Sequence, residues 1–308
     1  MTNNTQTPDL TITLSNVALT QKAISGFMLS RANNLVSNQP SLTRFLLGNE
    51  CNGFNASATE ANGSINGCAT HGNVWADFTG SWSSGSSYAL GTIGAHRVIN
   101  PDLLVGGMLQ FDHAEEDTNT ASGNGWMVGP YFVAKHGAQP LFFEGRLLYG
   151  GSSNTITAAG TTGIQSFSTN RSLAQLRATG EYELDNVVLM PMLDFTYTDD
   201  TQKTFVDTNG NTVPGQTVGV TQLSFGMDFR MPLSPLTDYK VDFTGGISGI
   251  YSETSGGEAD FGGGRGRVHF GLNSIMSNGS TFEAGVFYDG IGSDYESYGA
   301  NAGLAWKF

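Results

Sequence analysis

From residue 73 to the end of the chain, apolar and polar residues alternate with a period of two. In residues 141–150, for example, Phe143 and Leu147 share one face of the pattern and Glu144 lies on the other. Successive side chains of a strand point to opposite sides of a sheet, so this pattern predicts strands with one apolar and one polar face. Twelve such segments are present, at residues 73–83, 87–99, 103–115, 124–136, 140–151, 170–184, 186–199, 217–231, 238–252, 265–277, 280–290 and 295–308.

A different period precedes the strands, in residues 16–48. Ser15 and Asn16 are both good N-cap residues, and the apolar residues that follow recur at helical spacing. We therefore predict an α-helix that ends near Pro40, followed by one or two further turns up to Gly48. The apolar stripe of this helix is narrow, which favours polar, wet surroundings. Residues 49–72 are rich in Asn, Gly and Ser and show no period, so we interpret them as a linker.

The connections between the twelve segments tend to alternate between short and long. Short connections lie at residues 100–102, 136–139, 184–186, 232–238 and 277–280, and long ones at 116–123, 152–169, 200–216 and 253–264. The connections after the first and the eleventh segment are exceptions, because both are short. Sorting of loop lengths to opposite ends is typical of a transmembrane β-barrel, with short turns in the periplasm and long loops outside the cell.

Other features of the segments fit a barrel in a membrane. Their number is even, and their length suits the ~9–11 residues that a tilted strand needs to cross a bilayer. A closed sheet leaves no backbone polar group unpaired in lipid, so the apolar faces would point to lipid and the polar faces to a wet lumen. Aromatic residues near the segment ends resemble the girdles at the two membrane interfaces: Trp126, Tyr149, Tyr182, Tyr197, Tyr239, Tyr251, Tyr288, Trp306 and Phe308. The predicted fold is an all-β membrane protein, a twelve-stranded antiparallel transmembrane β-barrel (residues 73–308) with an N-terminal α-helix in its lumen.

Two prolines disturb the strand pattern. Pro130 and Pro191 fall inside predicted strands, although proline lacks the N–H group that a ladder needs and a closed barrel has no edge strand. We expect a bulge or a local break of the ladder at each of them.

Composition narrows the classes of function. The chain has 14 Lys and Arg against 27 Asp and Glu, a formal net charge of -13. This balance argues against binding of nucleic acid, which requires clustered basic residues. No apolar run approaches the ~18–20 residues of a transmembrane helix, and residues 1–10 lack the pattern of a secretory signal. Neither G-x-S-x-G nor H-E-x-x-H occurs, and none of the 5 histidines is followed two residues later by Ser, so we predict no enzyme, no metal site and no cofactor.

The chain ends in the sequence YGANAGLAWKF, which places Tyr298, Leu304, Trp306 and Phe308 in an alternating pattern with a terminal aromatic residue. Such an ending is the assembly signature of outer-membrane barrels. Together with a polar helix just before the first strand, twelve strands, and the segments SYALGTIGAHR and LLVGGMLQFDHAEED, it makes the chain resemble the C-terminal translocator domain of autotransporters. These are the type V secretion proteins of Gram-negative outer membranes.

The resemblance implies a function and a location. The barrel would assist export of an N-terminal passenger across the outer membrane and anchor it at the cell surface. The end of the passenger would cross the barrel as a helix and remain in the lumen, and residues 1–15 would be a passenger stub or a disordered tail. The implied partners are outer-membrane lipid and lipopolysaccharide, the barrel assembly machinery and the chain's own passenger, and the barrel would be a monomer. The alternative is a stand-alone outer-membrane porin or channel with a helical plug.

Charged residues on the polar faces of the strands form the main candidate site. They are Glu144, Arg146, Arg171, Arg177, Glu181, Asp194, Asp228, Arg230, Asp242, Arg267 and Glu283. Two interpretations stay open. The residues bind Lys22, Arg31 and Arg44 of the helical region and hold it as a plug, or they pair with each other across neighbouring strands.

Two pairs of residues carry possible covalent chemistry. In one subgroup of autotransporters, an Asn-Asn junction inside the barrel is cut by attack of an Asn side chain on its own backbone. The sequence around Asn33 and Asn34, SRANNLVSN, does not otherwise match that subgroup, and we interpret both as ordinary helix-surface residues. Cys51 and Cys68 are predicted to form a disulfide because the periplasm is oxidising, with a stabilisation of ~3 kcal/mol from loop closure; two free thiols are the alternative.

Overall fold

The computed structural model of the chain describes residues 8–46, 73–157, 163–233, 240–257, 259, 261–276 and 280–306. Helices α1 (Pro8–Ser37) and η1 (Thr43–Phe45) precede the strands. The strands are β1 (Asn73–Ser83), β2 (Ser86–Asn100), β3 (Leu103–Glu116), β4 (Ala121–Lys135), β5 (Leu141–Ile156), β6 (Gln165–Gly180), β7 (Tyr182–Leu184), β8 (Val187–Gln202), β9 (Phe205–Val206), β10 (Thr212–Val213), β11 (Gln216–Leu233), β12 (Lys240–Ser255), β13 (Gly263–Ile275), β14 (Thr281–Ile291) and β15 (Ser297–Trp306).

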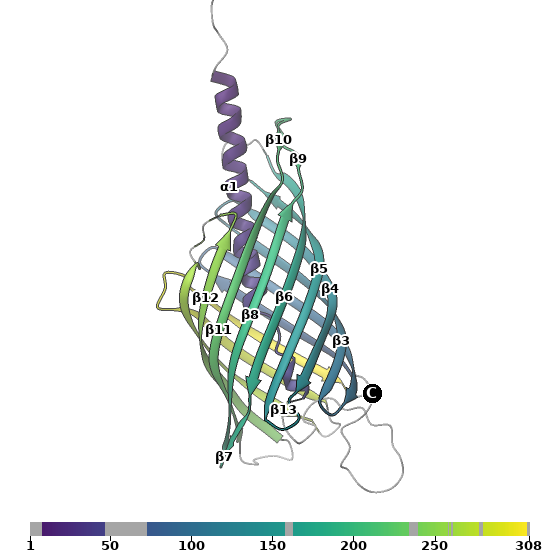
Figure 1. Cartoon of the computed structure of the whole chain (residues 1–308). Coiled ribbons are helices and arrows are strands. Elements are labelled where there is room, and N and C mark those ends of the chain that lie inside the picture. The colour runs from purple at the N-terminus through teal and green to yellow at the C-terminus, as the bar shows by residue number, and fades with distance from the viewer. Residues whose placement is uncertain are drawn as a thin grey trace, which may run out of the picture.

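Twelve long antiparallel strands close into a barrel (Figure 1). Each long strand pairs with the next one along the chain, and β8 pairs with both β6 and β11. The ring closes where β1 pairs with β15, from Val74↔Trp306 to Trp82↔Tyr298. The short strand β7 pairs with the start of β8, and β9 and β10 form a separate two-stranded hairpin. The predicted twelve-stranded antiparallel barrel is confirmed.

The strands are longer than predicted at the end of the barrel that carries the longer connections. β5 continues to Ile156 and β6 begins at Gln165, whereas the sequence pattern placed these ends at residues 151 and 170. β4 begins at Ala121, so the connection expected at 116–123 is reduced to residues 117–120. The outward residues of these extensions are Ser, Thr and Asn, so they show no contrast between apolar and polar positions from which a strand could be recognised.

Both prolines interrupt a ladder without shifting its register. Between β4 and β5, pairing stops at Val128↔Tyr149 and resumes at Tyr131↔Arg146 in the same register. Between β6 and β8 it stops at Thr179↔Met192, and β7 resumes the same register at Tyr182↔Leu189. Of the two outcomes expected from the sequence, these are ladder breaks.

The helix begins earlier than predicted. α1 starts at Pro8 instead of near residue 16, so half of the segment expected to be a passenger stub or disordered tail is helical. Proline suits the first helical position because its fixed φ is already helical and its missing N–H has no partner there in any case. The Thr and Ile residues at positions 11–13 have low helix propensity, which concealed this part of the helix.

The outward face of the barrel is apolar around its middle. Large outward side chains that are more than half exposed include Phe78, Ile93, Leu147, Leu176, Phe225 and Ile247. A continuous exposed apolar band on a closed sheet is the surface that lipid requires. Within the described part of the chain, no helix has the length and hydropathy needed to cross a membrane.

Several residues that the sequence analysis singled out lie outside the described ranges. They are Cys51, Cys68, Tyr239 and Phe308, and only the backbone of Trp306 is described. The predicted disulfide therefore stays a prediction, as does the role of the terminal aromatic residue.

Candidate functional site: the barrel lumen and its helix

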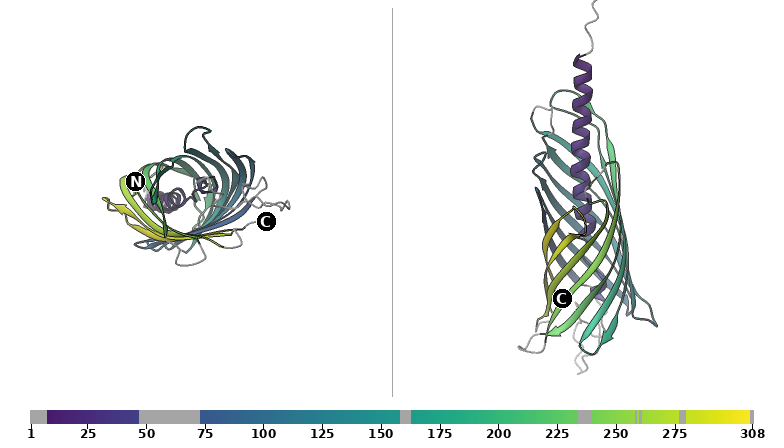
Figure 2. Two further views of the ribbon diagram at one scale, coloured as in Figure 1. Left: turned by 90° about the horizontal axis from the view of Figure 1, so that it is seen from below. Right: turned by 90° about the vertical axis from the view of Figure 1, so that its left-hand side faces the viewer.

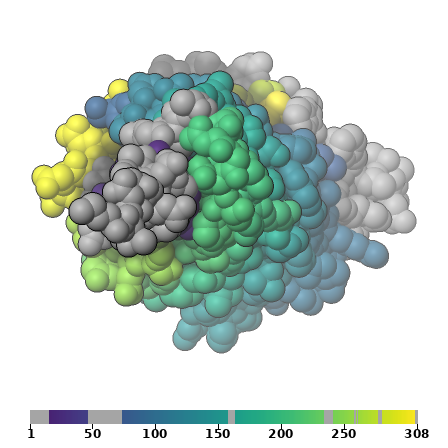
Figure 3. All heavy atoms as spheres, turned by 90° about the horizontal axis from the view of Figure 1, so that it is seen from above, coloured from purple at the N-terminus to yellow at the C-terminus, as the bar shows by residue number. Residues whose placement is uncertain are grey.

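Helix α1 runs along the inside of the barrel, with its N-terminal end at the side of the longer connections (Figures 1 and 2). The view from below shows the helix inside the ring of strands (Figure 2). In the view from above, the β8–β11 connection (green) stands beside the helix where it leaves the barrel (Figure 3). There Gln216 donates a hydrogen bond from Nε2 to the backbone oxygen of Gln21, at 2.8 Å.

The apolar side of α1 is buried. The helix residues involved are Ile24, Phe27, Met28, Leu29, Ala32, Leu35 and Val36. They belong to one buried apolar cluster with wall residues such as Phe167, Val218 and Val220. The narrow stripe that we expected to face a wet lumen is therefore matched by an apolar strip on the wall, and this correction explains why few apolar residues suffice to hold the helix.

An ion network joins the middle of the helix to the wall. Arg31 lies 2.7 Å from Asp112 of β3 and donates to Asn154 of β5 at 2.6 Å. Arg171 of β6 binds the second carboxylate oxygen of Asp112 at 2.7 Å and lies 3.7 Å from Asp200. The charged side chains are at most 3% exposed. Asp112 thus bridges a cation of the helix and a cation of the wall.

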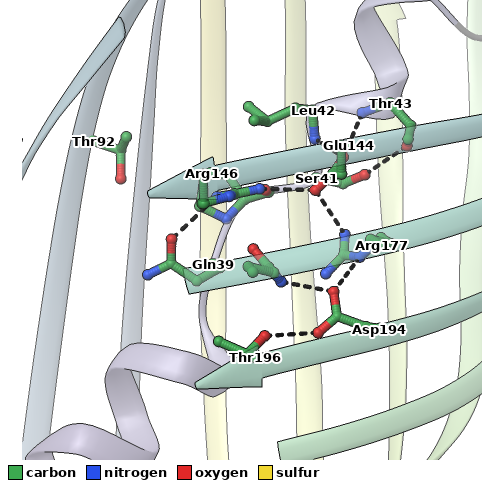
Figure 4. Close-up of polar contacts among 12 residues, drawn as sticks. Gln39, Ser41, Leu42, Thr43, Thr92, Glu144, Arg146, Arg177, Asp194 and Thr196 are labelled. Atoms are coloured by element: carbon green, nitrogen blue, oxygen red, sulfur yellow. Dashed lines mark hydrogen bonds and ion pairs between the residues drawn. The ribbon is translucent and has the colours of Figure 1, made fainter. Parts of the chain in front are cut away.

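A second network holds the turn after the helix (Figure 4). The carboxylate of Glu144 accepts hydrogen bonds from the backbone N–H groups of Leu42 and Thr43, each at 2.7 Å. Arg146 donates to the Gln39 side chain at 3.0 Å and to the backbone oxygen of Pro40 at 2.6 Å. Arg146 also pairs with Glu144 at 2.8 Å. One wall pair therefore satisfies both donors and acceptors of an irregular segment inside the barrel.

Arginines of the wall also meet the C-terminal end of α1. Arg267 donates to the backbone oxygen of Ser37 at 2.6 Å. Arg265 donates to the Asn33 side chain at 3.0 Å and pairs with Asp289 at 2.9 Å. The last turn of α1 contains no basic residue of its own. The barrel supplies the positive charge that stabilises the negative end of the helix dipole.

The remaining candidates pair within the wall. Arg177 binds Asp194 at 2.7 Å, and Asp194 also accepts hydrogen bonds from Gln175 and Thr196. Glu181 pairs with Arg230 at 3.3 Å. Both interpretations of the polar residues therefore apply, each to a different part of the lumen.

The predicted helix cations behave differently from one another. Arg31 and Arg44 bind wall acids, Arg44 through Asp77 at 3.5 Å and through Glu283. Lys22 is exposed and forms no ion pair among the described residues, so its contact with the wall stays a prediction.

Two further predicted acids belong to β11 and β12. Asp228 of β11 lies 3.6 Å from His269 of β13, across Gly246 of the intervening strand β12. Asp242 is half-buried on β12, opposite Asn273.

Five charged residues of these networks were not among the sequence candidates: Asp77, Asp112, Asp200, Arg265 and Asp289. All five belong to strands that the sequence analysis identified or bordered, and the alternation of those strands already places them on the inner face. Arg265 is the first residue of the segment predicted at 265–277 and lies in β13. Following the inward phase to the ends of each strand would have found all five.

A cavity of about 350 Å³ remains beside the turn that follows the helix. Arg177, Asp228, Arg230, Arg267 and His269 are among its lining residues. No group of three or more potential metal ligands occurs within the described ranges. The lumen is therefore filled mainly by the helix and its turn, with a polar space on the β8–β13 side.

Asn33 and Asn34 are both held by hydrogen bonds inside the barrel. The Asn33 side chain donates to the Tyr295 hydroxyl at 3.1 Å and accepts from Arg265. The Asn34 side chain donates to the Ser30 backbone oxygen at 3.0 Å and accepts from the Ser81 hydroxyl at 2.9 Å. They are lumen contacts between helix and wall, which the prediction of ordinary surface asparagines missed.

Comparisons with known proteins agree with this architecture. The chain matches the family model described as Autotransporter beta-domain over residues 65–286. The β-domain of the Bordetella autotransporter BrkA aligns with a TM-score of 0.66 at 17% identity, covering 77% of this chain and 99% of that one. The translocator domain of NalP from Neisseria meningitidis gives 0.62 at 18% identity, with 78% and 89% covered. The transport unit of AIDA-I from Escherichia coli gives 0.53 at 12% identity, with 80% and 94% covered. No curated protein sequence matches at a significant level.

Proposed function

The chain belongs to the autotransporter β-domain family, so its barrel is an outer-membrane translocator of a Gram-negative bacterium, and we propose that α1 is the part of the exported chain that stays in the pore. The position of α1 carries this proposal. Its N-terminal end points out of the barrel at the side of the longer connections, which is the cell surface in outer-membrane barrels. A passenger linked upstream of α1 would therefore lie outside the cell and be anchored by the helix.

The ion networks of the lumen support the anchoring role. Arg31 is fastened to β3 and β5 of the wall, and the turn at Leu42 and Thr43 is fastened to β5. Pulling the helix out would take Arg31 away from Asp112, the backbone N–H groups of Leu42 and Thr43 away from Glu144, and the Asn33 side chain away from Arg265, so each of these wall charges would keep only its partners in the wall. Removing one partner of a buried charge is strongly unfavourable.

The partners follow from the same role. We propose that the alternating pattern of Tyr298, Leu304, Trp306 and Phe308 is read by the barrel assembly machinery, and that the barrel acts as a monomer surrounded by outer-membrane lipid and lipopolysaccharide. The β-domain acts as a translocator and anchor, and the activity of the whole protein would belong to its passenger.

Export can be tested with a reporter fused upstream of the full chain. An epitope-tagged reporter is expected to reach the surface of intact cells, where added protease removes it while the barrel remains in the outer-membrane fraction. Loss of the reporter signal without cell lysis is the readout, and a periplasmic marker protein controls for leakage. A reporter that stays protected beside a correctly inserted barrel contradicts the translocator role.

We propose that the bond between Asn33 and Asn34 stays intact. Cleavage would require the Asn33 side-chain nitrogen to turn toward its own backbone carbonyl, away from Tyr295 and Arg265. After membrane insertion, the fused chain is therefore expected to migrate as one band, identical to the band of an Asn33→Ala variant. Two bands that merge into one in Asn33→Ala would show that cleavage occurs.

A further inference from the structure

The outer face of β4, β5 and β6 changes character toward the cell-surface end. Trp126 on β4 and Tyr149 on β5 are outward and 48% and 60% exposed, in the position of an interface girdle. Above these two rings the strands continue as far as Ala121, Ile156 and Gln165. The outward side chains of this extension are all polar: Ser122, Asn124, Ser153, Thr155, Ser166, Ser168 and Asn170. We call this set the outer hydroxyl face.

The strand register arranges the outer hydroxyl face in rows. One row joins Asn124, Ser153 and Ser168 across the three strands. The row toward the membrane joins Trp126, Gly151 and Asn170. Neighbouring strands lie ~4.8 Å apart, so the members of a row are adjacent. Gly151 presents no side chain between the indole ring and the amide, and a Cβ at this position would lie 2.8 Å from the backbone oxygen of Thr169.

Hydrogen bonding differs between the two sides of these strands. On the inner side, Asn154 donates to Ser152 at 2.8 Å, and Ser152 and Thr169 share a hydrogen bond of 2.8 Å. On the outer side, six side chains of the outer hydroxyl face make no hydrogen bond to any described residue: Ser122, Ser153, Thr155, Ser166, Ser168 and Asn170. A set of polar groups that is neither used for folding nor charged is available to a neutral polar ligand.

The charge of this face excludes one class of ligand. Above Tyr149, the described outward residues of β4, β5 and β6 include no Lys and no Arg. Phosphate groups are normally recognised by these cations. Sugar hydroxyl groups match the observed hydroxyls and amides as donors and acceptors, and the C–H faces of a sugar ring pack on aromatic rings such as those of Trp126 and Tyr149.

We propose that the outer hydroxyl face, with Trp126 and Tyr149 at its lower edge, binds the core oligosaccharide of lipopolysaccharide. The face is continuous with the apolar band that contacts lipid, and it stands directly above the girdle, where the sugars of the outer leaflet lie. This step rests on the outer-membrane location and adds a ligand to the translocator role. The contact is made to sugar hydroxyls, so it should depend little on salt or on divalent cations.

The test uses the full chain in detergent micelles and core oligosaccharide released from rough lipopolysaccharide. Saturation-transfer NMR is expected to show binding that persists in 0.5 M salt and with a metal chelator. The variant Ser153→Ala/Ser168→Ala/Asn170→Ala should weaken binding roughly tenfold, which corresponds to ~1.4 kcal/mol. The control Ser87→Ala removes an outward hydroxyl beside Trp82, on the hairpin of β1 and β2, which β3 separates from β4, and should bind like the parent.

Three outcomes overturn the proposal. They are no binding of the oligosaccharide, equal binding by the triple variant and the parent, and binding that disappears with the chelator, which would identify phosphate groups bridged by cations. Circular dichroism checks that the variants are folded. Surface display of the reporter should be unchanged in the triple variant, so a failure of sugar binding can be told apart from a failure of the translocator role.

Discussion

Deleting residues 8–46 is expected to convert a closed barrel into a conducting pore. Helix α1 alone buries seven apolar side chains in the lumen, from Ile24 to Val36. The deletion also removes the turn that Glu144 holds. Full burial of one large apolar side chain stabilises by ~1.5–3 kcal/mol. The free energy that holds the helix in the barrel is therefore on the order of 10 kcal/mol. This is an upper bound, because the released chain is itself partly compact. At that free energy the helix of the intact protein stays in place.

Single-channel recording in planar bilayers measures the effect. The intact chain should show at most small currents through the polar cavity beside the turn, and the deletion variant should show stable currents several times larger. Adding a synthetic peptide of residues 8–46 to the surface side should lower the current again, which controls for a damaged barrel. Equal conductance of the intact and deleted chains would favour the porin alternative, because the helix would then not close the pore.

The barrel itself was predictable from the sequence because lipid imposes a simple rule on it. Each lipid-facing residue between the girdles is apolar, so period-two alternation marks every strand that crosses the membrane. The prolines could be interpreted in the same way. A missing N–H at Pro130 or Pro191 has to interrupt a closed ladder, and it does. The rule does not apply beyond the membrane surface, because the extensions of β5 and β6 carry polar residues on their outer face.

The lumen was predictable only in part. The alternating pattern predicts that Glu144 and Arg146 point inward. It does not predict that Glu144 accepts hydrogen bonds from the backbone of Leu42 and Thr43, about a hundred residues away in the sequence. Such contacts depend on the depth and rotation of α1 in the barrel. These are set by the apolar strip that includes Val218 and Val220, which sequence alone does not distinguish from other inward residues.

The charge of a helix residue does not by itself predict that the residue contacts the barrel wall. Lys22 and Arg31 lie nine residues apart, which is two and a half helical turns, so they point to opposite sides of the helix, and only Arg31 reaches Asp112. Lys22 stands at the level where α1 is leaving the barrel and is exposed. Alternation places the opposite charges Asp112 and Arg171 on the inner faces of β3 and β6, although Asp112 was not among the sequence candidates.

Replacing Asp112 with Asn is expected to lower the free energy of unfolding by roughly 3–5 kcal/mol, the usual cost of breaking a buried ion pair from one side. The carboxylate holds Arg31 through one oxygen and Arg171 through the other. Its neutral replacement leaves Arg31 with Asn154 alone, and leaves Arg171 with Asp200 at 3.7 Å. Both guanidinium groups are almost fully buried, so water cannot replace the lost charge.

Guanidinium-induced unfolding in micelles, followed by tryptophan fluorescence, measures this change. Asp102→Asn is the matched control, because Asp102 is exposed in the turn between β2 and β3 and should shift stability by less than ~0.5 kcal/mol. In the chain without residues 8–46, Arg31 is absent, so Asp112→Asn should cost less there, and the difference between the two backgrounds is the coupling of helix to wall. A loss below ~1 kcal/mol in the full chain, or an equal loss in both backgrounds, would mean that Asp112 stabilises the wall alone and does not retain the helix.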